Sequence, residues 1–505
     1  GNSAARPGTI APWWGYYSSY YCYDNTNIDC SVRYRTMPFN GKGTDVDSDI
    51  TNPTSWDLVD SPIRINPSTD YLSVSADLTI EAGVVVQVAS GKGISFDGTC
   101  DSMTVNGNDS AHVKFEGQNG ADWKGIAFTA ACATAGGTDD RHTFSYADFY
   151  NTSDAAIAAG SRHGSNPSAN ANVGNFTMTE VTFTNVGNAI QHGSGDNTVF
   201  DLTCVSVTGS DDSCLDMPDG ATLNAFDLDL ENCNTNGGSA DGAIRFGDGG
   251  NLMIENSTID DAYGNVINFV TAADDIHISN LTVTNSFGTT QTGGAILAGG
   301  ANAGSDLYVY NMDVGTGYTS GITSEATDSF ILEDVDFGTG AIAYLPGGST
   351  SSANGPSGDM AILDDVTSGA ITLARTAPGT FDMITSSGDI TLSGNSPVTT
   401  QVRLNSINAM ALLIDGCGWN VAYETFTADE FSSSCSSSAA PNTVVVKDGT
   451  LAHIDSATNA IYSRNSHVTL GSVAVTSSDI SSSNSNYVAK GSTNGDIVMI
   501  DVDYN

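Results

Sequence analysis

One eight-residue pattern returns repeatedly between Phe176 and Phe337. Its first and third positions are large and apolar, its fifth is often Asn or Asp, and its eighth is usually apolar. The copies recur about every 23 to 31 residues, a period that indicates a solenoid, a propeller or an array. The copies are FTMTEVTF from Phe176, FDLTCVSV from Phe200, FDLDLENC from Phe226, LMIENSTI from Leu252, IHISNLTV from Ile276, LYVYNMDV from Leu307 and FILEDVDF from Phe330. The alternation predicts one strand, buried on one face, in every repeat.

A second, shorter apolar phrase follows most copies after a turn that contains Gly or Asn. Two or three strands per repeat, with polar corners and no amphipathic helix between them, favour a parallel β-helix. A propeller would need four antiparallel strands in each longer repeat, and an ordinary parallel sheet would need helical crossovers. We therefore predict an all-β parallel β-helix whose stacked coils fill the interior with apolar ladders. The second phrases are NAIQH, SCLDM, GAIRF, NVINF, GAIAY and GAITL, which contain Ile190, Leu215, Ile244, Ile267, Ile342 and Ile371.

The net charge of the chain excludes several partners. With 58 acidic and 16 basic residues the formal charge is −42, so nucleic acid and anionic membrane would be repelled. An apolar run of about 18 residues, the length of a membrane-spanning helix, is missing. The chain opens GNSAARPGT without the apolar core of a signal peptide, so an exported protein would be represented here by its mature form.

Residues 56 to about 200 carry a family resemblance. A Trp-containing start is followed by LTIEAGVVV from Leu78, by the glycine-bounded stretch from Gly91 to Gly98, and by WKGI from Trp123. These phrases resemble the first coils of right-handed parallel β-helix repeat proteins on bacterial and archaeal surfaces, although Ala82 stands where Pro is usual. The resemblance implies a right-handed coil and an exported, cell-surface protein. It is weak for function, because sites are grafted on folds independently.

The domain organisation follows from where the repeat begins. Residues 1–55 lack it, are rich in Trp and Tyr, and are predicted to cap the first coil; subunit docking is the alternative. Residues 56–505 are predicted to form one β-helix, with a loosening or break near 435–443. The last copy of the strand phrase begins at Ile497, so either the chain is cut from a longer one or its open end meets another molecule.

Nine cysteines suit an exported protein. Spacing suggests three local disulfides, although connectivity does not follow from spacing. The pairs are Cys22 with Cys30, Cys100 with Cys132 and Cys417 with Cys435. Cys204, Cys214 and Cys233 remain. Cys214 and Cys233 align with core positions, so we interpret them as buried thiols that act as small hydrophobes.

Two further motifs are weaker. Asp45, Asp47 and Asp49 alternate in a loop and could converge on calcium, but the Gly and Glu of an EF-hand loop are missing. Five asparagines open glycosylation sequons. For Asn256 and Asn280 we favour a hydrogen-bonded ladder along the stack instead of a glycan. The five are Asn108, Asn151, Asn175, Asn256 and Asn280.

One constellation could be catalytic. Aligning the second strands places Asp216 beside Arg245 on a ladder that also includes Gln191 and Asn268, and Asp212 and His192 lie nearby in the alignment. The pair could hold a polysaccharide. The competing interpretation is an ordinary surface ion pair of small energetic consequence. The G-H-G and R-I-K signatures of polygalacturonases do not follow Asp211 and Asp212.

The sequence therefore favours a non-catalytic extracellular structural protein: a subunit of a surface layer, sheath or filament, or an adhesin stalk. Its expected partners are copies of itself, other surface proteins and glycans. The alternatives are a β-helix polysaccharide lyase or glycoside hydrolase, including a phage-tailspike type, and a calcium-dependent glycan-binding module.

Overall fold

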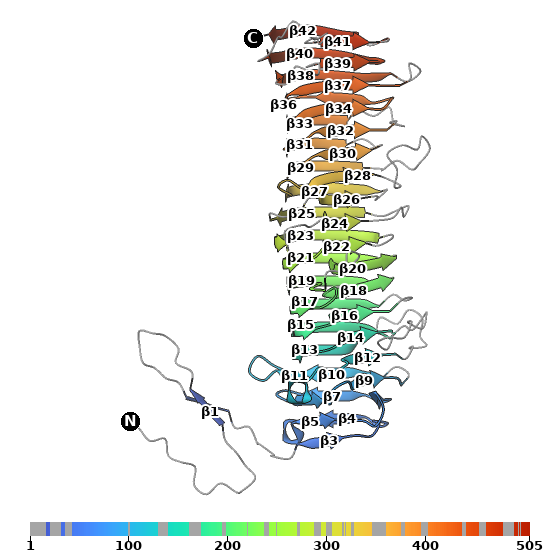
Figure 1. Ribbon diagram of the computed structural model, residues 1–505, viewed down its shortest axis with the longest axis vertical. Coiled ribbons are helices and arrows are strands. Elements are labelled where there is room, and N and C mark those ends of the chain that lie inside the picture. The colour runs from blue at the N-terminus through green and yellow to red at the C-terminus, as the bar shows by residue number, and fades with distance from the viewer. Residues whose placement is uncertain are drawn as a thin grey trace. The chain divides into compact units, whose positions relative to one another are not determined.

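The computed structural model divides into two units, residues 1–208 and 209–505, called unit 1 and unit 2 below (Figure 1). The parts of the chain that it describes are residues 17–20, 32–35, 43–98, 101–129, 140–160, 173–193, 198–219, 221–236, 242–248, 250–269, 273–286, 294–298, 306–315, 318, 320–324, 328–345, 360–374, 379–394, 402–436, 441–453, 461–477, 489–492, 494 and 496–504. Across these residues the regular structure is β-strand, apart from the short 3-10 turns η1 (Leu58–Asp60) and η2 (Gln118–Gly120). In the same residues, no helix is long and apolar enough to cross a bilayer.

Unit 1 is a parallel β-helix. Its second sheet pairs β6 with β9, β9 with β12, β12 with β14 and β14 with β16, all in parallel. The strands of the second sheet are β6 (Tyr71–Val74), β9 (Gly93–Phe96), β12 (Ile126–Phe128), β14 (Ala155–Ala159) and β16 (Asn188–His192). Those of the first sheet are β3 (Thr44–Val46), β4 (Thr54–Trp56), β5 (Ile63–Ile65), β7 (Leu78–Glu81), β8 (Val85–Val88), β10 (Met103–Asn106), β11 (Val113–Gly117), β13 (Asp140–Tyr150), β15 (Asn175–Val186) and β17 (Val199–Ser210).

In the first coils of unit 1, two short strands take the place of one long one. The long strand β13 pairs through its first half with β10 and through its second half with β11. Those two strands pair in turn with β7 and β8. Each short pair is joined by a turn, residues 82–84 in one coil and 107–112 in the next. Parallel pairing already begins at β3, which pairs with β5, ahead of the expected start at residue 56.

Unit 2 is built from the same kind of coil, and parallel pairing is found on both sides of residues 437–440. Its first sheet contains β19 (Thr222–Glu231), β21 (Gly250–Ala262), β23 (Ala273–Ser286), β25 (Asp306–Val314), β27 (Ser329–Asp336), β29 (Met360–Ser368), β31 (Gly379–Ser386), β33 (Val402–Asn408), β35 (Asn420–Tyr423), β36 (Phe426–Ala428), β38 (Asn442–His453), β40 (Ser466–Ser477) and β42 (Asp496–Tyr504). Its second sheet contains β18 (Leu215–Asp219), β20 (Gly242–Asp248), β22 (Asn265–Phe269), β24 (Gly294–Ala298), β26 (Ser320–Ser324), β28 (Ala341–Tyr344), β30 (Ile371–Ala374), β32 (Ile390–Ser393), β34 (Ala411–Asp415), β37 (Glu430–Ser434), β39 (Ile461–Arg464) and β41 (Ala489–Ser492).

The fifth position of the repeated phrase bends each long strand. Its residues have φ between 48° and 58° in coil after coil. This left-handed region is costly for most L-residues and is tolerated best by Gly, Asn and Asp, which explains the preference seen in the sequence. The residues at this bend are Tyr146, Glu180, Cys204, Asp227, Asn256, Asn280, Asn311, Asp334, Asp365, Met383 and Ser406.

The bend also corrects one copy of the phrase. Leu223, and not Phe226, pairs with Leu252, so the copy assigned to Phe226 begins three residues earlier. Asp227 then occupies the bend, and Phe226 lies outside with 46% of its surface exposed. The sequence misled because Phe226, Leu228 and Leu230 alternate correctly, while the bend between them reverses which face points inward.

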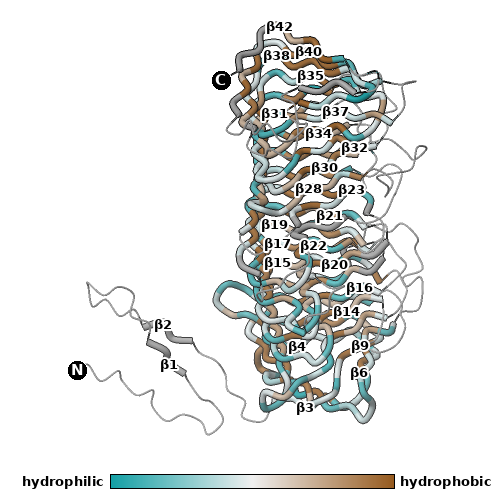
Figure 2. The backbone as a smooth tube through the Cα atoms, turned by 45° about the horizontal axis from the view of Figure 1, so that its top comes forward, coloured by the Kyte–Doolittle hydropathy of each residue, from teal (hydrophilic) through white to brown (hydrophobic). Residues whose placement is uncertain are grey.

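Apolar and aromatic ladders fill the interior of each unit, and in Figure 2 brown segments recur from coil to coil. In unit 1 the rings of Phe115, Phe149 and Phe183 stack with centroids 4.6 and 5.0 Å apart. In unit 2 Phe330 stacks on Tyr344 at 4.5 Å. Burial of such rings contributes more than their area alone, because stacked aromatic pairs add about 0.5–1.5 kcal/mol each.

The disulfides confirm one cysteine prediction and correct another. Cys417 is bonded to Cys435, as expected. Cys214 and Cys233 are bonded to each other and are fully buried, so interpreting them as two buried thiols was wrong. Both were rightly placed in the core, but they meet only because the corner before β18, which holds Cys214, stacks on the corner before β20, which holds Cys233. Cys204 lies at the bend of β17 and is half-buried.

The other two predicted disulfides, Cys22–Cys30 and Cys100–Cys132, involve cysteines outside the described residues. Of the predicted N-terminal cap, residues 1–55, the described parts are β1 (Tyr17–Tyr20) and β2 (Val32–Arg35), which pair antiparallel, and residues 43–55, whose strand β3 already belongs to the first coils. The two disulfides that are described, both in unit 2, indicate an oxidising compartment.

Candidate functional site

The ladder predicted from the second strands is present in unit 2. Asp216 pairs in register with Arg245, and Arg245 with Asn268. An Arg245 Nη1 donates to Asp216 Oδ1 at 2.8 Å, and the two side chains are 27% and 12% exposed. The pair is therefore partly buried, and the Asp216 carboxylate is less accessible than that of an ordinary surface ion pair. Removing one partner of such a pair leaves a poorly solvated charge and costs more than at a surface.

The other two members of that candidate patch, Asp212 and His192, differ in their exposure to solvent. Asp212 is exposed at the corner before β18. His192 is 1% exposed within unit 1, and its ring lies edge-on to Phe200 with centroids 6.0 Å apart. A buried ring packed in this way is a core residue, which makes His192 unsuitable as a surface catalyst.

Two of the three candidate calcium ligands, Asp45 and Asp49, bond to other residues of the first coils of unit 1. Arg64 Nη1 lies 3.3 Å from Asp45 Oδ1, and Asp49 Oδ1 accepts a hydrogen bond from Ser73 N at 3.2 Å. Asp47 lies between them and is exposed. Across the described ranges, no three His, Cys, Asp or Glu side chains group in a way that could hold a metal ion.

The sequon asparagines mostly brace the backbone or one another. Asn280 Nδ2 donates to Asn256 Oδ1 at 2.8 Å, and Asn311 Nδ2 donates to Asn280 Oδ1 at 2.6 Å. The ladder predicted for Asn256 and Asn280 is therefore confirmed. Asn108 Oδ1 accepts from Ser110, and Asn175 Oδ1 accepts from Val199 N.

A hollow of about 520 Å³ lies on the outer face of the first sheet of unit 1, where the first coils are split into short strands. Its floor is made by outward side chains of β8, β11 and β13. Register places Lys114 between Val85 and Asp148, and Glu116 beside Gln87. Its volume is within the range of small-molecule sites.

One end of the floor is a linked set of polar groups around a buried carboxylate. Asp148 is 8% exposed, and its Oδ1 accepts from Thr182 Oγ1 at 2.7 Å. His112 Nδ1 lies 3.0 Å from the same oxygen, and because a carboxylate only accepts, this nitrogen carries the hydrogen. The Asp148 carboxylate therefore fixes the His112 ring, whose Nε2 remains a hydrogen-bond acceptor in the neutral form.

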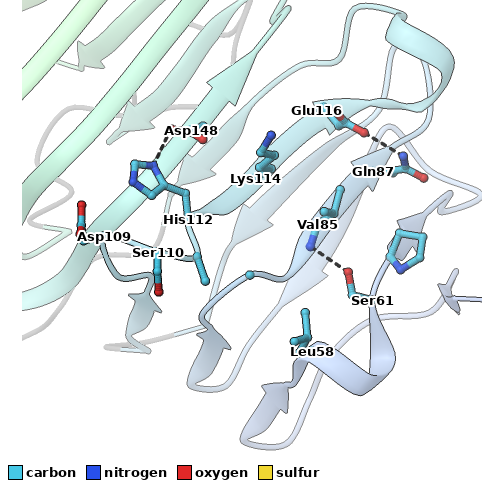
Figure 3. Close-up of a pocket in the computed structure, with 13 residues that line it drawn as sticks. Leu58, Ser61, Val85, Gln87, Asp109, Ser110, His112, Lys114, Glu116 and Asp148 are labelled. Atoms are coloured by element: carbon cyan, nitrogen blue, oxygen red, sulfur yellow. Dashed lines mark hydrogen bonds and ion pairs between the residues drawn. The ribbon is translucent and has the colours of Figure 1, made fainter. Parts of the chain in front are cut away.

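The other end of the floor pairs a carboxylate with an amide. Gln87 Nε2 donates to Glu116 Oε1 at 2.8 Å, and Figure 3 shows Lys114 between this pair and the His112–Asp148 pair. Burial raises the pKa of the neighbouring Tyr150 hydroxyl, and Asp148 and Glu116 add to the shift. The neutral phenol is therefore the form present beside these two carboxylates.

Turns between the short strands wall the hollow. At Gly83 the backbone has φ +80°, and a Cβ there would lie 3.3 Å from Leu58 Cδ1 and 3.5 Å from the Ala111 side chain. Gly83 N also donates to Ala111 O at 3.1 Å, which joins the two turns. Ser61 Oγ accepts from Val85 N at 3.0 Å and fixes the strand end beneath them.

This arrangement has the features of a binding site more than those of a catalytic one. Two serines line the hollow: Ser110 donates its hydroxyl to Asn108 Oδ1 at 2.8 Å, and Ser61 Oγ accepts from Val85 N at 3.0 Å. Neither bond is made to His112, so neither serine is set against it as a nucleophile would be against its base. The chain matches no known family model, no curated protein and no solved structure. Function must therefore be argued from these side chains.

Sequence reasoning missed the hollow because its groups come from four successive coils and share no motif. A signal was present: the long repeated phrase is interrupted at residues 82–84 and 107–112, and loops inserted into a solenoid often carry the binding face. Among the described residues, the long strands of the 176–337 repeat have no such interruption.

Proposed function

We propose that the protein is a non-catalytic structural component outside the cell, a stack of coils that serves as a stalk or as a subunit of a surface layer, sheath or filament. The observation that carries the proposal is the use of exterior polar side chains to join one coil to the next. In unit 2 Thr258 Oγ1 donates to Asp229 Oδ1 and Thr284 Oγ1 to Asp260 Oδ1, each at 2.6 Å.

Three kinds of ladder then hold each coil to its neighbour. Backbone hydrogen bonds join the parallel strands, apolar side chains stack inside, and Asn, Asp and Thr side chains bond outside. Asn405 extends the outer ladder by donating to Asp382 at 3.0 Å and accepting from Thr425 at 3.2 Å. Exterior polar side chains that bond to the next coil suit a structural role, because every interface between coils is reinforced in the same way.

The extracellular location rests on the described disulfides and on the acidic composition, since counter-ions of a saline medium screen self-repulsion. Copies of the chain or other surface proteins are the proposed partners. Assembly is tested by negative-stain imaging of the purified protein, with and without calcium. Filaments or lattices support a subunit role, and monodisperse particles with and without calcium reject it in favour of a stalk.

The enzymatic alternative makes a distinct prediction. A lyase or hydrolase would release unsaturated or reducing sugar ends from acidic polysaccharides, and Asp216→Ala and Arg245→Ala would abolish that release. Such turnover would overturn the structural proposal. A calcium-dependent rise in melting temperature, without turnover, would instead favour a calcium-dependent glycan-binding module.

A further inference from the structure

The hollow in unit 1 combines three chemistries that a polyhydroxylated ligand needs. Glu116 and Asp148 offer carboxylate oxygens, while Lys114 and the Gln87 amide offer N–H donors (Figure 3). Each group keeps hydrogen-bonding capacity beyond the bonds described above, because a carboxylate has two oxygens and an amide has two N–H groups. Donors and acceptors therefore alternate across the floor at the spacing of neighbouring strands, about 4.8 Å.

The wall of the hollow supplies an apolar surface beside these polar groups. Leu58, Pro62, Val85 and Ala111 are each half-buried and line the same space. A sugar ring has this dual character, with hydroxyl groups at its edge and C–H groups on its face. A ligand that was apolar throughout would leave the buried Asp148 carboxylate desolvated without a new partner, which is costly.

The charges that line the hollow narrow the class of ligand further. Three carboxylates, those of Asp109, Glu116 and Asp148, line the hollow against one ammonium group, Lys114. An anionic sugar such as a uronate would meet this negative excess, and the protein as a whole is strongly acidic. A cationic group at the centre of the floor would lie against Lys114, although the carboxylates at the margin would attract it. A neutral ligand avoids repulsion by the carboxylates and by Lys114, and fits both polar pairs at once.

We propose that this hollow binds a neutral saccharide unit directly, without a bridging metal ion. Glu116 and Asp148 accept hydrogen bonds from hydroxyl groups, Gln87 and Lys114 donate to ring or hydroxyl oxygens, and the C–H face lies against Leu58 and Val85. The buried Asp148 is held in place beforehand by His112 and Thr182, so little ordering remains to be done on binding.

The test is calorimetric titration of the full chain with three sets of oligosaccharides: neutral hexose, uronate and amino-sugar oligomers, each in calcium and in excess EDTA. We expect a neutral set to bind in both buffers, and Glu116→Ala and Gln87→Ala to weaken the association at least tenfold. Glu333→Ala, the same change on the first sheet of unit 2, is the matched control and should leave the affinity unchanged.

A second variant guards against loss of folding. Ser110 is exposed at the rim, so Ser110→Trp should block the hollow while far-ultraviolet circular dichroism and the melting temperature stay those of the parent. Preference for uronates, preference for amino sugars, loss of binding in EDTA, no binding by any set, or full binding by Ser110→Trp would each overturn the proposal. None of these outcomes bears on whether the chain assembles, so this site and the structural role fail separately.

Discussion

Met383 occupies the left-handed bend of β31 with φ 48° and is 49% exposed. Its equivalents in neighbouring coils are Asp365 and Ser406, as the register of β29, β31 and β33 shows. Methionine has no local hydrogen bond to offset this backbone conformation, whereas asparagine adopts it readily. We therefore expect Met383→Asn to stabilise this part of unit 2.

The expected change in stability combines two favourable contributions and one unfavourable contribution. Relief of the left-handed conformation is worth about 1–2 kcal/mol, and an asparagine amide beside Asp365 adds a hydrogen bond of about 0.5 kcal/mol at an exposed site. The loss of the half-buried methionine side chain costs up to about 1 kcal/mol. Met410→Asn is the matched control, because Met410 is 53% exposed and is not among the residues with positive φ. The difference between the two variants isolates the backbone contribution.

A solenoid of this length need not unfold in one step, so local stability is the quantity to measure. Hydrogen exchange followed by mass spectrometry on peptides from β29 to β33 reports local opening. A gain of about 1 kcal/mol slows exchange about fivefold, since RT is about 0.59 kcal/mol. If Met383→Asn exchanges no more slowly than Met410→Asn, the left-handed bend does not determine the preference at the fifth position.

Other perturbations have equally definite outcomes. Asn280→Ala removes two hydrogen bonds of the ladder and the residue type best suited to a φ of 51°. The free energy of local opening in β21 to β25, measured by hydrogen exchange, should therefore fall by about 2 kcal/mol. An unchanged exchange rate would show that the ladder does not stabilise these strands. Changing Cys214 and Cys233 together to Ala removes the disulfide between cysteines that are 19 residues apart. The free energy of local opening there should fall by about 3 kcal/mol. The measurement is the rate of proteolysis within unit 2 of the full chain, compared with that of the variant in which Cys417 and Cys435 are both changed to Ala. Burial, and then the charges of Asp77 and Asp97, raise the pKa of Asp101. Because this pKa is higher in the folded than in the unfolded state, the protein loses stability as the pH rises through the folded-state pKa and regains it as the pH falls. Asp101→Asn should therefore raise the melting temperature near neutral pH, with an advantage that shrinks on acidification, and a constant difference across pH would contradict the assignment.

Much of the fold was readable from the sequence because burial alternates within each strand. The phrases at Phe176, Phe200 and Leu252 lie in long strands, and the second phrases near Ile190 and Ile244 lie in short ones. Each prediction depended only on residues within one strand and its turn. The Asn256–Asn280 ladder was also predictable, because a fixed repeat places identical side chains above one another.

The features that could not be predicted from the sequence depend on the geometry between coils or within a bend. Phe226 was assigned to the interior because the reversal at Asp227 leaves no mark on the hydropathy pattern. Cys214 and Cys233 were placed in the core, but their pairing depends on how the corners of two successive coils stack. The hollow joins His112 to Asp148 across two strands, and the turns that wall it look like ordinary polar loops in the sequence.

The in-register pairing of unit 2 makes its reach adjustable in fixed increments. Leu252 of one coil pairs with Ile276 of the next, so removing residues 252–275 would bring Ile276 into register with Leu223. Neighbouring parallel strands are about 4.8 Å apart, and each added or deleted coil therefore changes the height of the stack by that amount. Gene duplication or deletion of whole coils could tune how far such a protein extends without redesigning a single interface.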